Sequence, residues 1–272
     1  MEIEKFKSEG NGKVPSFEVM HRDCLEALET VASNSVDAII TDPPYGSGGF
    51  HEATKIRSQV MGIKKHRLDE IDWFPSDNMT TVGMRWLMRE LCLRLDRVMK
   101  PDTSLLMFTD WRMVPNLVPV IESCGFMYRN LIVWNKKSSG QGYGFRPQHE
   151  IIMQFVKGAA KFHSGSVGNV ITCKRTNPNT RVHHTQKPVE LLGELIKVVT
   201  KPGDTILDPF AGSSSTGEAA IKMGRNFVGI EKAGTHYLTS VERLQKVQEK
   251  MQGSMFDVGE FYPEDEDKNE EE

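Results

Sequence analysis

The sequence predicts an α/β fold built as one domain around a single β-sheet. Short apolar segments of strand character alternate with longer segments whose apolar residues recur at helical spacing, a pattern typical of this class. The chain has 272 residues, of which 38% are hydrophobic and 26% charged, so it can bury a large core. It has no internal repeat, no apolar run of the ~18 residues that a membrane span needs, and no secretory signal at its start.

Strands and helices follow one another along most of the chain. Six segments are predicted as strands: Val36–Thr41 and residues 105–109, 131–134, 151–156, 205–207 and 227–230. Five segments are predicted as helices: residues 84–98, 114–123, 189–199, 216–223 and 237–252. We expect Pro101 to stop the first helix, and we expect Trp86 and Met88 in the core.

Two irregular segments and a tail complete the predicted organisation. Residues 1–257 are expected to form the domain, with insertions at 46–80 and 158–184. Loops of this length are uncommon unless they are functional or disordered. Residues 258–272 hold eight acidic residues and one lysine, which leaves residues 1–257 with a net charge of +4 although the whole chain has −3. The tail is expected to be disordered, and the mildly basic body is compatible with a nucleic-acid partner.

The four cysteines, at positions 24, 92, 124 and 173, show no CxxC spacing. This argues against a disulfide framework and against a structural zinc site. No other metal site is predicted. Reduced thiols fit a cytoplasmic protein best.

The first chemistry-bearing motif, residues 208–217 (DPFAGSSSTG), follows a predicted strand and opens a predicted helix. Its small residues would let the backbone approach a ligand, and the N–H groups at the helix start are donors. Nineteen residues after Gly212, Glu231 follows the next strand, where an acid suits the hydroxyls of a ribose. The alternative is a tight turn and an unrelated surface acid.

The second motif is Asp42-Pro43-Pro44-Tyr45, directly after the strand Val36–Thr41. The two prolines fix the backbone. Such a turn would aim a carboxylate, the Pro43 carbonyl and an aromatic ring at one spot, which suits a planar ring with an exocyclic amine. The alternative is a rigid surface turn with a packed tyrosine.

Both motifs directly follow predicted strands. The carboxyl ends of the strands are the place where open α/β sheets bind ligands. Together the two motifs resemble the DNA amino-methyltransferases that use S-adenosylmethionine, and their order resembles the circularly permuted β class of that family. Further matches are residues 21–25 (HRDCL), 133–136 (VWNK), 149–150 (HE), 183–188 (HHTQKP) and 224–231. Two positions depart from the family: Ser214 stands where a glycine is frequent, and His184 where proline is common.

The resemblance implies a circularly permuted, Rossmann-like methyltransferase fold. Its sheet would be mostly parallel and twisted, with one antiparallel edge strand and helices on both faces. The implied reaction is methylation of the N6 amine of a flipped adenine in duplex DNA. Asp42, Pro43, Pro44 and Tyr45 would hold the base. The residues implied for the cofactor are Asp23, Cys24, Thr185, Lys187, Asp208, Phe210, Ala211, Gly212, Ser213 and Glu231.

The basic stretch 53–68 in the first insertion is expected to contact DNA phosphates, with a solvated loop as the alternative. The resemblance implies that the second insertion, 158–184, takes part in target recognition. The candidates are Lys55, Arg57, Lys64, Lys65, Arg67, Lys174, Arg175 and Arg181. A homodimer and a restriction endonuclease partner are implied by the resemblance alone. Two alternatives stay open: cytosine-N4 methylation on the same fold, and a catalytically silent nucleic-acid-binding subunit.

Overall fold

The computed structural model describes residues 4–11, 14–45, 79–140, 143–165, 167–175 and 186–257. The strands are β1 (Glu4–Ser8), β2 (Phe17–His21), β3 (Val36–Thr41), β4 (Met99–Thr109), β5 (Met127–Asn135), β6 (His149–Lys157), β7 (Val170–Thr172), β8 (Thr205–Asp208) and β9 (Asn226–Glu231). The helices are α1 (Cys24–Leu28), α3 (Thr81–Val98), α4 (Val114–Glu122), α5 (Val189–Val199), α6 (Ser215–Lys222) and α7 (Gly234–Asp257).

The described strands form one sheet in the order β1-β2-β9-β8-β3-β4-β6-β5-β7. Five adjacent strands, from β2 to β4, are parallel to one another, and β5 and β7 run in the same direction. The prediction of one antiparallel strand, at an edge, is correct only in part. Two strands run the other way: β1, which lies at an edge, and β6, which lies inside the sheet between β4 and β5.

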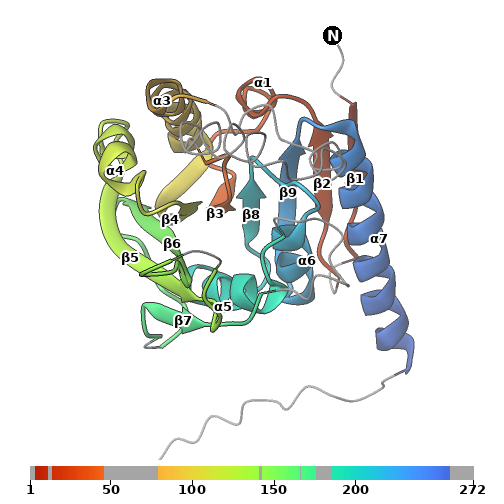
Figure 1. The fold of residues 1–272 in the computed structure, drawn as a ribbon. Helices are drawn as coiled ribbons and strands as arrows, with labels where there is room; N and C mark the ends of the chain where they lie inside the picture. The colour runs from red at the N-terminus through yellow and green to blue at the C-terminus, as the bar shows by residue number, and fades with distance from the viewer. Residues whose placement is uncertain are drawn as a thin grey trace, which may run out of the picture.

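Helices cover both faces of the sheet, as predicted (Figure 1). Alternate residues of β3 show the two faces: Ile39 packs with α1, α3 and α4, whereas Ala38 and Ile40 pack with α5, α6 and α7. These three residues have no exposed surface. A strand buried on both faces is continuously apolar rather than alternating, which is why Val36–Thr41 was recognisable in the sequence.

All the predicted strands and helices are present; β3 and α5 have the predicted ends, and the ends of the others are shifted. The structure adds β1, β2, α1 and β7, the last within the segment predicted to be irregular. These elements have three to five residues each, too few to establish a periodic pattern.

The helix before Pro101 ends at residue 98, as predicted. This helix, α3, ends three residues before Pro101 because Met99 is already extended (φ −72°, ψ 137°) and begins β4. Pro101 lies in β4 where its pairing with β3 is interrupted, between Met99 and Ser104. A proline lacks the N–H that a regular ladder requires, so an irregularity of this kind accommodates it.

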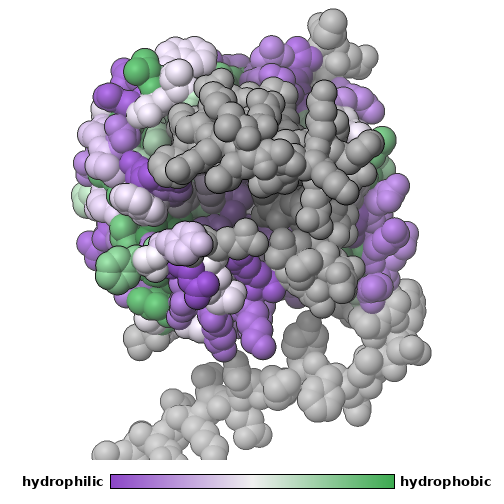
Figure 2. All heavy atoms as spheres, viewed as in Figure 1, coloured by the Kyte–Doolittle hydropathy of each residue, from purple (hydrophilic) through white to green (hydrophobic). Residues whose placement is uncertain are grey.

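The four cysteines are free, buried thiols. No helix in the described part of the chain is long and apolar enough to cross a membrane. On the face shown in Figure 2, the hydrophobic spots of the described surface lie among hydrophilic residues.

Candidate active site

The two sequence motifs open onto the same cleft, which has a volume of about 700 Å³. Strands β3 and β8 are parallel neighbours, paired at Ala38↔Ile206 and Ile39↔Leu207, so the motifs that follow them emerge side by side. A hydrogen bond joins them directly, because Thr41 Oγ1 donates to Asp208 Oδ1 at 2.8 Å. The cleft is therefore built across the junction of two strands that are far apart in the sequence.

The carboxylate of Asp42 has a partner on each oxygen. The hydroxyl of Tyr45 donates to Oδ1 at 2.7 Å, and the ammonium of Lys187 lies 2.6 Å from Oδ2. The same ammonium also donates to the Tyr45 hydroxyl oxygen at 3.1 Å. Tyr45, Asp42 and Lys187 thus form a closed triangle of polar contacts at the bottom of the cleft.

Behind this triangle lies a second pair of charges that sequence reasoning did not assign to the site. Glu150 on β6 lies 3.1 Å from the Lys187 ammonium through Oε2 and pairs with Lys136 through Oε1. Lys136 follows β5, which pairs with β6 so that Asn135 faces His149. The sequence offered a signal in the matches at 133–136 and 149–150, but these matches carry no role by themselves.

Burial and the neighbouring charges move the pKa values of this cluster in different directions. Burial raises the pKa of Asp42, against the attraction of Lys187. Burial alone would lower the pKa of Lys187, but Asp42 and Glu150 together raise it above its usual value. Burial alone would raise the pKa of Glu150, but Lys187 and Lys136 hold it below its usual value. Both Lys187 and Glu150 are therefore charged at neutral pH.

The loop after β8 forms the other wall. Gly212 and Ser214 both have left-handed backbone conformations, with φ of 52° and 53°. Such a conformation costs an L-residue roughly 1–2 kcal/mol, and glycine avoids that cost. The buried hydroxyl of Ser214 instead contacts the hydroxyl of Ser240 on α7. The departure from the family's glycine is thus accompanied by a contact that a glycine could not make.

Glu231, at the end of β9, holds this loop in place by hydrogen bonding. Its carboxylate accepts the N–H of Gly212 at 2.9 Å and the N–H of Ala233 at 2.7 Å. Asp23 lies close to Glu231, at the start of α1, where its carboxylate accepts the N–H of Leu25 at 3.0 Å and pairs with Lys232 at 3.1 Å. Both acids line the cleft while also ordering the backbone around it.

Burial raises the pKa of two further groups that line the cleft, Asp208 and Cys24. Burial raises the pKa of Asp208 to about 7, although Thr41, Thr216 and the N–H of Phe210 donate to its carboxylate. Burial raises the pKa of the Cys24 thiol to about 12, so this side chain is a neutral part of the wall.

Most of the predicted site residues lie in the cleft. Those that line it are Asp23, Cys24, Asp42, Pro43, Pro44, Tyr45, Lys187, Asp208, Phe210, Ala211, Gly212, Ser213 and Glu231. Lys174 and Arg175 are exposed just after β7. Thr185, Lys55, Arg57, Lys64, Lys65, Arg67 and Arg181 fall outside the described residues.

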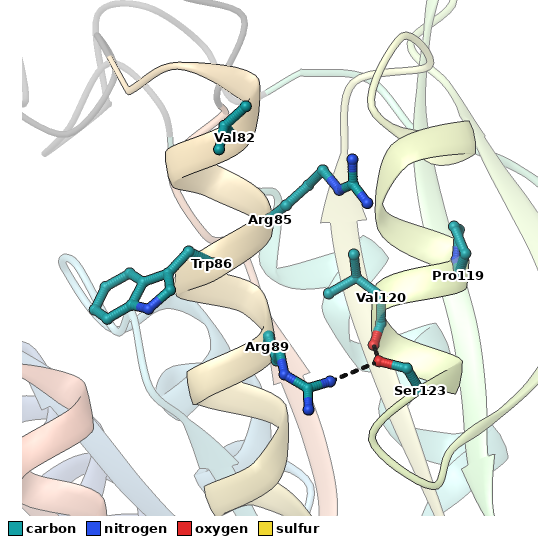
Figure 3. Close-up of a pocket in the computed structure, with 7 residues that line it drawn as sticks. All are labelled: Val82, Arg85, Trp86, Arg89, Pro119, Val120 and Ser123. Atoms are coloured by element: carbon teal, nitrogen blue, oxygen red, sulfur yellow. Dashed lines mark hydrogen bonds between the residues drawn. The ribbon is translucent and has the colours of Figure 1, made fainter.

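The prediction that Trp86 belongs to the core is wrong, whereas Met88 is fully buried. Trp86 is 59% exposed and lines the cleft. Figure 3 shows its ring pointing away from the groove between α3 and α4, into which Arg85 and Arg89 point. Neighbouring positions on a helix point in different directions, so the apolar character of Trp86 was a poor guide to its burial.

Comparison with known proteins agrees with this arrangement. Residues 36–242 match the family model described as DNA methylase, N6/N4 type. The protein YubD of Escherichia coli (strain K12) is 31% identical over 242 residues, which cover 89% of this chain and 96% of that protein. The type II methyltransferase M.HinfI of Haemophilus influenzae is 25% identical over 253 residues, covering 84% of this chain and 68% of that protein.

Two solved structures share the fold. The PvuII DNA methyltransferase, which is cytosine-N4-specific, has a TM-score of 0.65 at 15% identity and covers 90% of this chain and 97% of its own. The complex of M1.HpyAVI with S-adenosylmethionine has a TM-score of 0.59 at 23% identity and covers 84% of this chain and 100% of its own.

Proposed function

Because the chain belongs to the N6/N4 DNA methylase family, whose members use S-adenosylmethionine, we propose that it methylates the N6 amine of a flipped adenine in duplex DNA. The observation that carries the proposal is the shared cleft. Asp42 and Tyr45 lie on one side of it, and the loop after β8 lies on the other. A volume of about 700 Å³ is within the usual range for small-molecule sites.

The residues of the second wall fit the cofactor. Glu231 would take the ribose hydroxyls, because its carboxylate already lies at the loop that would hold the nucleoside. Asp23 and the backbone of Cys24 would meet the adenine ring. The residues proposed around the methionine part are Thr185, Lys187, Asp208, Phe210, Ala211, Gly212 and Ser213. When bound, S-adenosylmethionine would supply a methyl group on a sulfonium: the amine nitrogen would bond to the methyl carbon, the sulfur would leave as a neutral thioether, and the nitrogen would then release one proton.

The residues at the end of β3 would prepare the amine. Its lone pair is delocalised into the adenine ring, so the free amine is a poor nucleophile. Hydrogen bonds from its two N–H groups to Asp42 and to the Pro43 carbonyl would favour a pyramidal nitrogen and stabilise the positive charge that develops there. Tyr45 would stack on the base, which has to leave the duplex to reach this position. Pro44 would hold the turn rigid.

We propose adenine rather than cytosine because the motif begins with aspartate, whereas serine more often marks cytosine-N4 enzymes in the family. Cytosine presents a similar amine and is the second candidate. We also propose that the basic residues of 53–68, with Lys174, Arg175 and Arg181, contact the DNA phosphates. We propose further that the fold is circularly permuted, that the protein is cytoplasmic and that it acts beside a restriction endonuclease.

The test is methyl transfer from radiolabelled S-adenosylmethionine to DNA, followed by nucleoside analysis. We expect N6-methyladenine as the product. Asp42→Ala should abolish transfer while cofactor binding, measured by calorimetry, stays largely intact. Product in the form of N4-methylcytosine would reject the choice of base, and near-normal turnover of the variant would reject the role of Asp42.

Asp37→Ala is a matched control for Asp42→Ala. Asp37 lies at the other end of β3, pairs with Lys100 at 2.7 Å and accepts the N–H of Thr205 at 2.9 Å. Its side chain is 17% exposed, compared with 25% for Asp42. The control therefore also removes a half-buried, ion-paired carboxylate from the same strand, and it should retain methyl transfer.

A further inference from the structure

The Lys187 ammonium poses a problem for the proposed chemistry. It lies 2.6 Å from the carboxylate that would accept the amine, in a site where positive charge develops on the nitrogen. A carboxylate tightly paired with a cation is a weaker acceptor for another donor. A second positive charge beside the reacting nitrogen would also oppose the reaction, because charges interact strongly where water is excluded.

Glu150 is placed to relieve this problem. It approaches the same ammonium from the β6 side at 3.1 Å, so Lys187 lies between two carboxylates. Within the described part of the chain, Glu150 Oε2 is buried and receives no hydrogen bond from any other donor. Lys136, whose ammonium contacts the other oxygen, fixes the orientation of Glu150. The acceptor for a displaced Lys187 is thus already in position.

Charge counting leads to the same conclusion. Asp42, Lys187 and Glu150 together carry a net charge of −1, which favours a developing positive charge. If Glu150 were neutral, Asp42 and Lys187 would sum to zero; with Lys136 counted in both cases, the sum would change from zero to +1. Glu150 therefore makes the charge around Asp42 more negative by one unit.

We propose that Glu150 is a positioning residue for methyl transfer: it draws the Lys187 ammonium away from Asp42 when the base enters, so that Asp42 can accept the amine. This inference rests on the proposed function and adds to it a role for a residue outside both sequence motifs. Lys136 acts through Glu150 by holding its carboxylate toward Lys187.

Glu150→Gln tests the proposal. The change keeps the shape of the side chain and removes its charge. We expect kcat to fall roughly 10- to 100-fold, the usual cost of removing a group that orients a functional side chain, while the affinity for S-adenosylmethionine changes little. Glu150→Asp, which retains the charge, should recover part of the loss. Glu194→Gln is the control, since that carboxylate lies on α5 and is 40% exposed beside Lys197.

A titration gives a readout that does not depend on activity. The ionisable groups around Asp42 are Tyr45 on the same loop, Lys187 before α5, Glu150 on β6 and Asp208 at the end of β8, with Lys136, just after β5, further out. Removing the like charge of Glu150 should lower the pKa of Asp42, as followed by carbon NMR of its carboxyl group in wild type and Glu150→Gln. Loss of packing alone, without loss of the charge, would not lower the pKa of Asp42 in this way.

The outcomes separate the two hypotheses. If the wild type transfers no methyl group to DNA, the proposed function fails, and the titration still decides whether Glu150 governs the Lys187–Asp42 pair. An unchanged Asp42 titration, or a Glu150→Gln variant with wild-type kcat, overturns the inference. A loss of kcat with equal loss of cofactor affinity and no recovery in Glu150→Asp also overturns it.

Discussion

Gly217 in α6 is predicted to tolerate no larger residue, although alanine favours helices. A Cβ added at Gly217 would lie 2.7 Å from two ring atoms of Phe227 and 2.9 Å from Leu244 Cδ2. Carbon atoms normally meet at ~3.5–4.0 Å. Phe227 is 1% exposed and Leu244 is not exposed at all, so neither side chain can yield into solvent.

Overpacking of a core costs ~1–3 kcal/mol, and the higher helix propensity of alanine returns up to ~1 kcal/mol. We therefore expect Gly217→Ala to lower the free energy of unfolding by about 1 kcal/mol, the middle of the overpacking range less the full gain in helix propensity. Helix α6 begins directly after the loop that lines the cleft, so the affinity for S-adenosylmethionine should fall as well. Urea denaturation followed by circular dichroism measures the first effect, and calorimetry measures the second.

Gly193→Ala is the matched control, because α5 packs against α6. Its added Cβ would meet Met223 Sδ at 3.4 Å and no other atom of the described residues within 4 Å. Methionine adapts readily, so this variant should gain up to ~1 kcal/mol of stability from helix propensity. The reasoning is refuted if the two substitutions change stability in the same direction, or if Gly217→Ala is as stable as the wild type.

Three further predictions concern the cleft and the DNA. Glu231→Gln replaces one acceptor oxygen by an amide NH₂, so a backbone N–H loses a charge-assisted hydrogen bond. The affinity for S-adenosylhomocysteine, measured by calorimetry, should therefore fall by roughly 10-fold or more. An unchanged affinity contradicts this prediction. Neutral Asp208 stabilises the fold fully below about pH 4, the range of an unfolded aspartate, and this contribution is lost as the pH rises to its pKa of about 7. The stability of Asp208→Asn relative to wild type should therefore increase between these pH values, whereas a constant difference would exclude the shifted pKa. Replacing Lys64 and Lys65 by alanine should weaken DNA binding and flatten its salt dependence, as measured by fluorescence anisotropy; unchanged binding would place both lysines away from the DNA.

The parts of the fold that the sequence predicted share a physical cause. Val36–Thr41 is buried on both faces, and α5 places its apolar residues on a single buried stripe, so each leaves a clear pattern. Strand β1 lies at the edge of the sheet, with largely polar residues, and leaves none. The direction of β6 was also beyond reach, because an apolar run has the same composition in a parallel and an antiparallel strand.

The parts of the candidate site that lie in turns were predictable, because their residue types are distinctive in the sequence. The prolines of 43–44 and the small residues of 211–215 are unusual locally, and both turns line the cleft. Glu150 and Lys136 are not distinctive in this way: each is an ordinary charged residue near a strand end, and only the pairing of β5 with β6 brings them together. Trp86 was misjudged because composition alone does not tell which side of α3 it occupies.

Because β3 and β8 are neighbours in the sheet, the order of the two motifs in the sequence could be exchanged without changing the distance between them. Neighbouring strands are held ~4.8 Å apart by their ladder, so this spacing fixes the distance between the proposed base-binding turn after β3 and the proposed cofactor loop after β8. This spacing does not depend on which of the two strands comes first in the sequence. A variant in which the two ends of the chain are joined and a surface connection is opened should therefore keep this distance, provided that Thr41 and Asp208 remain hydrogen-bonded.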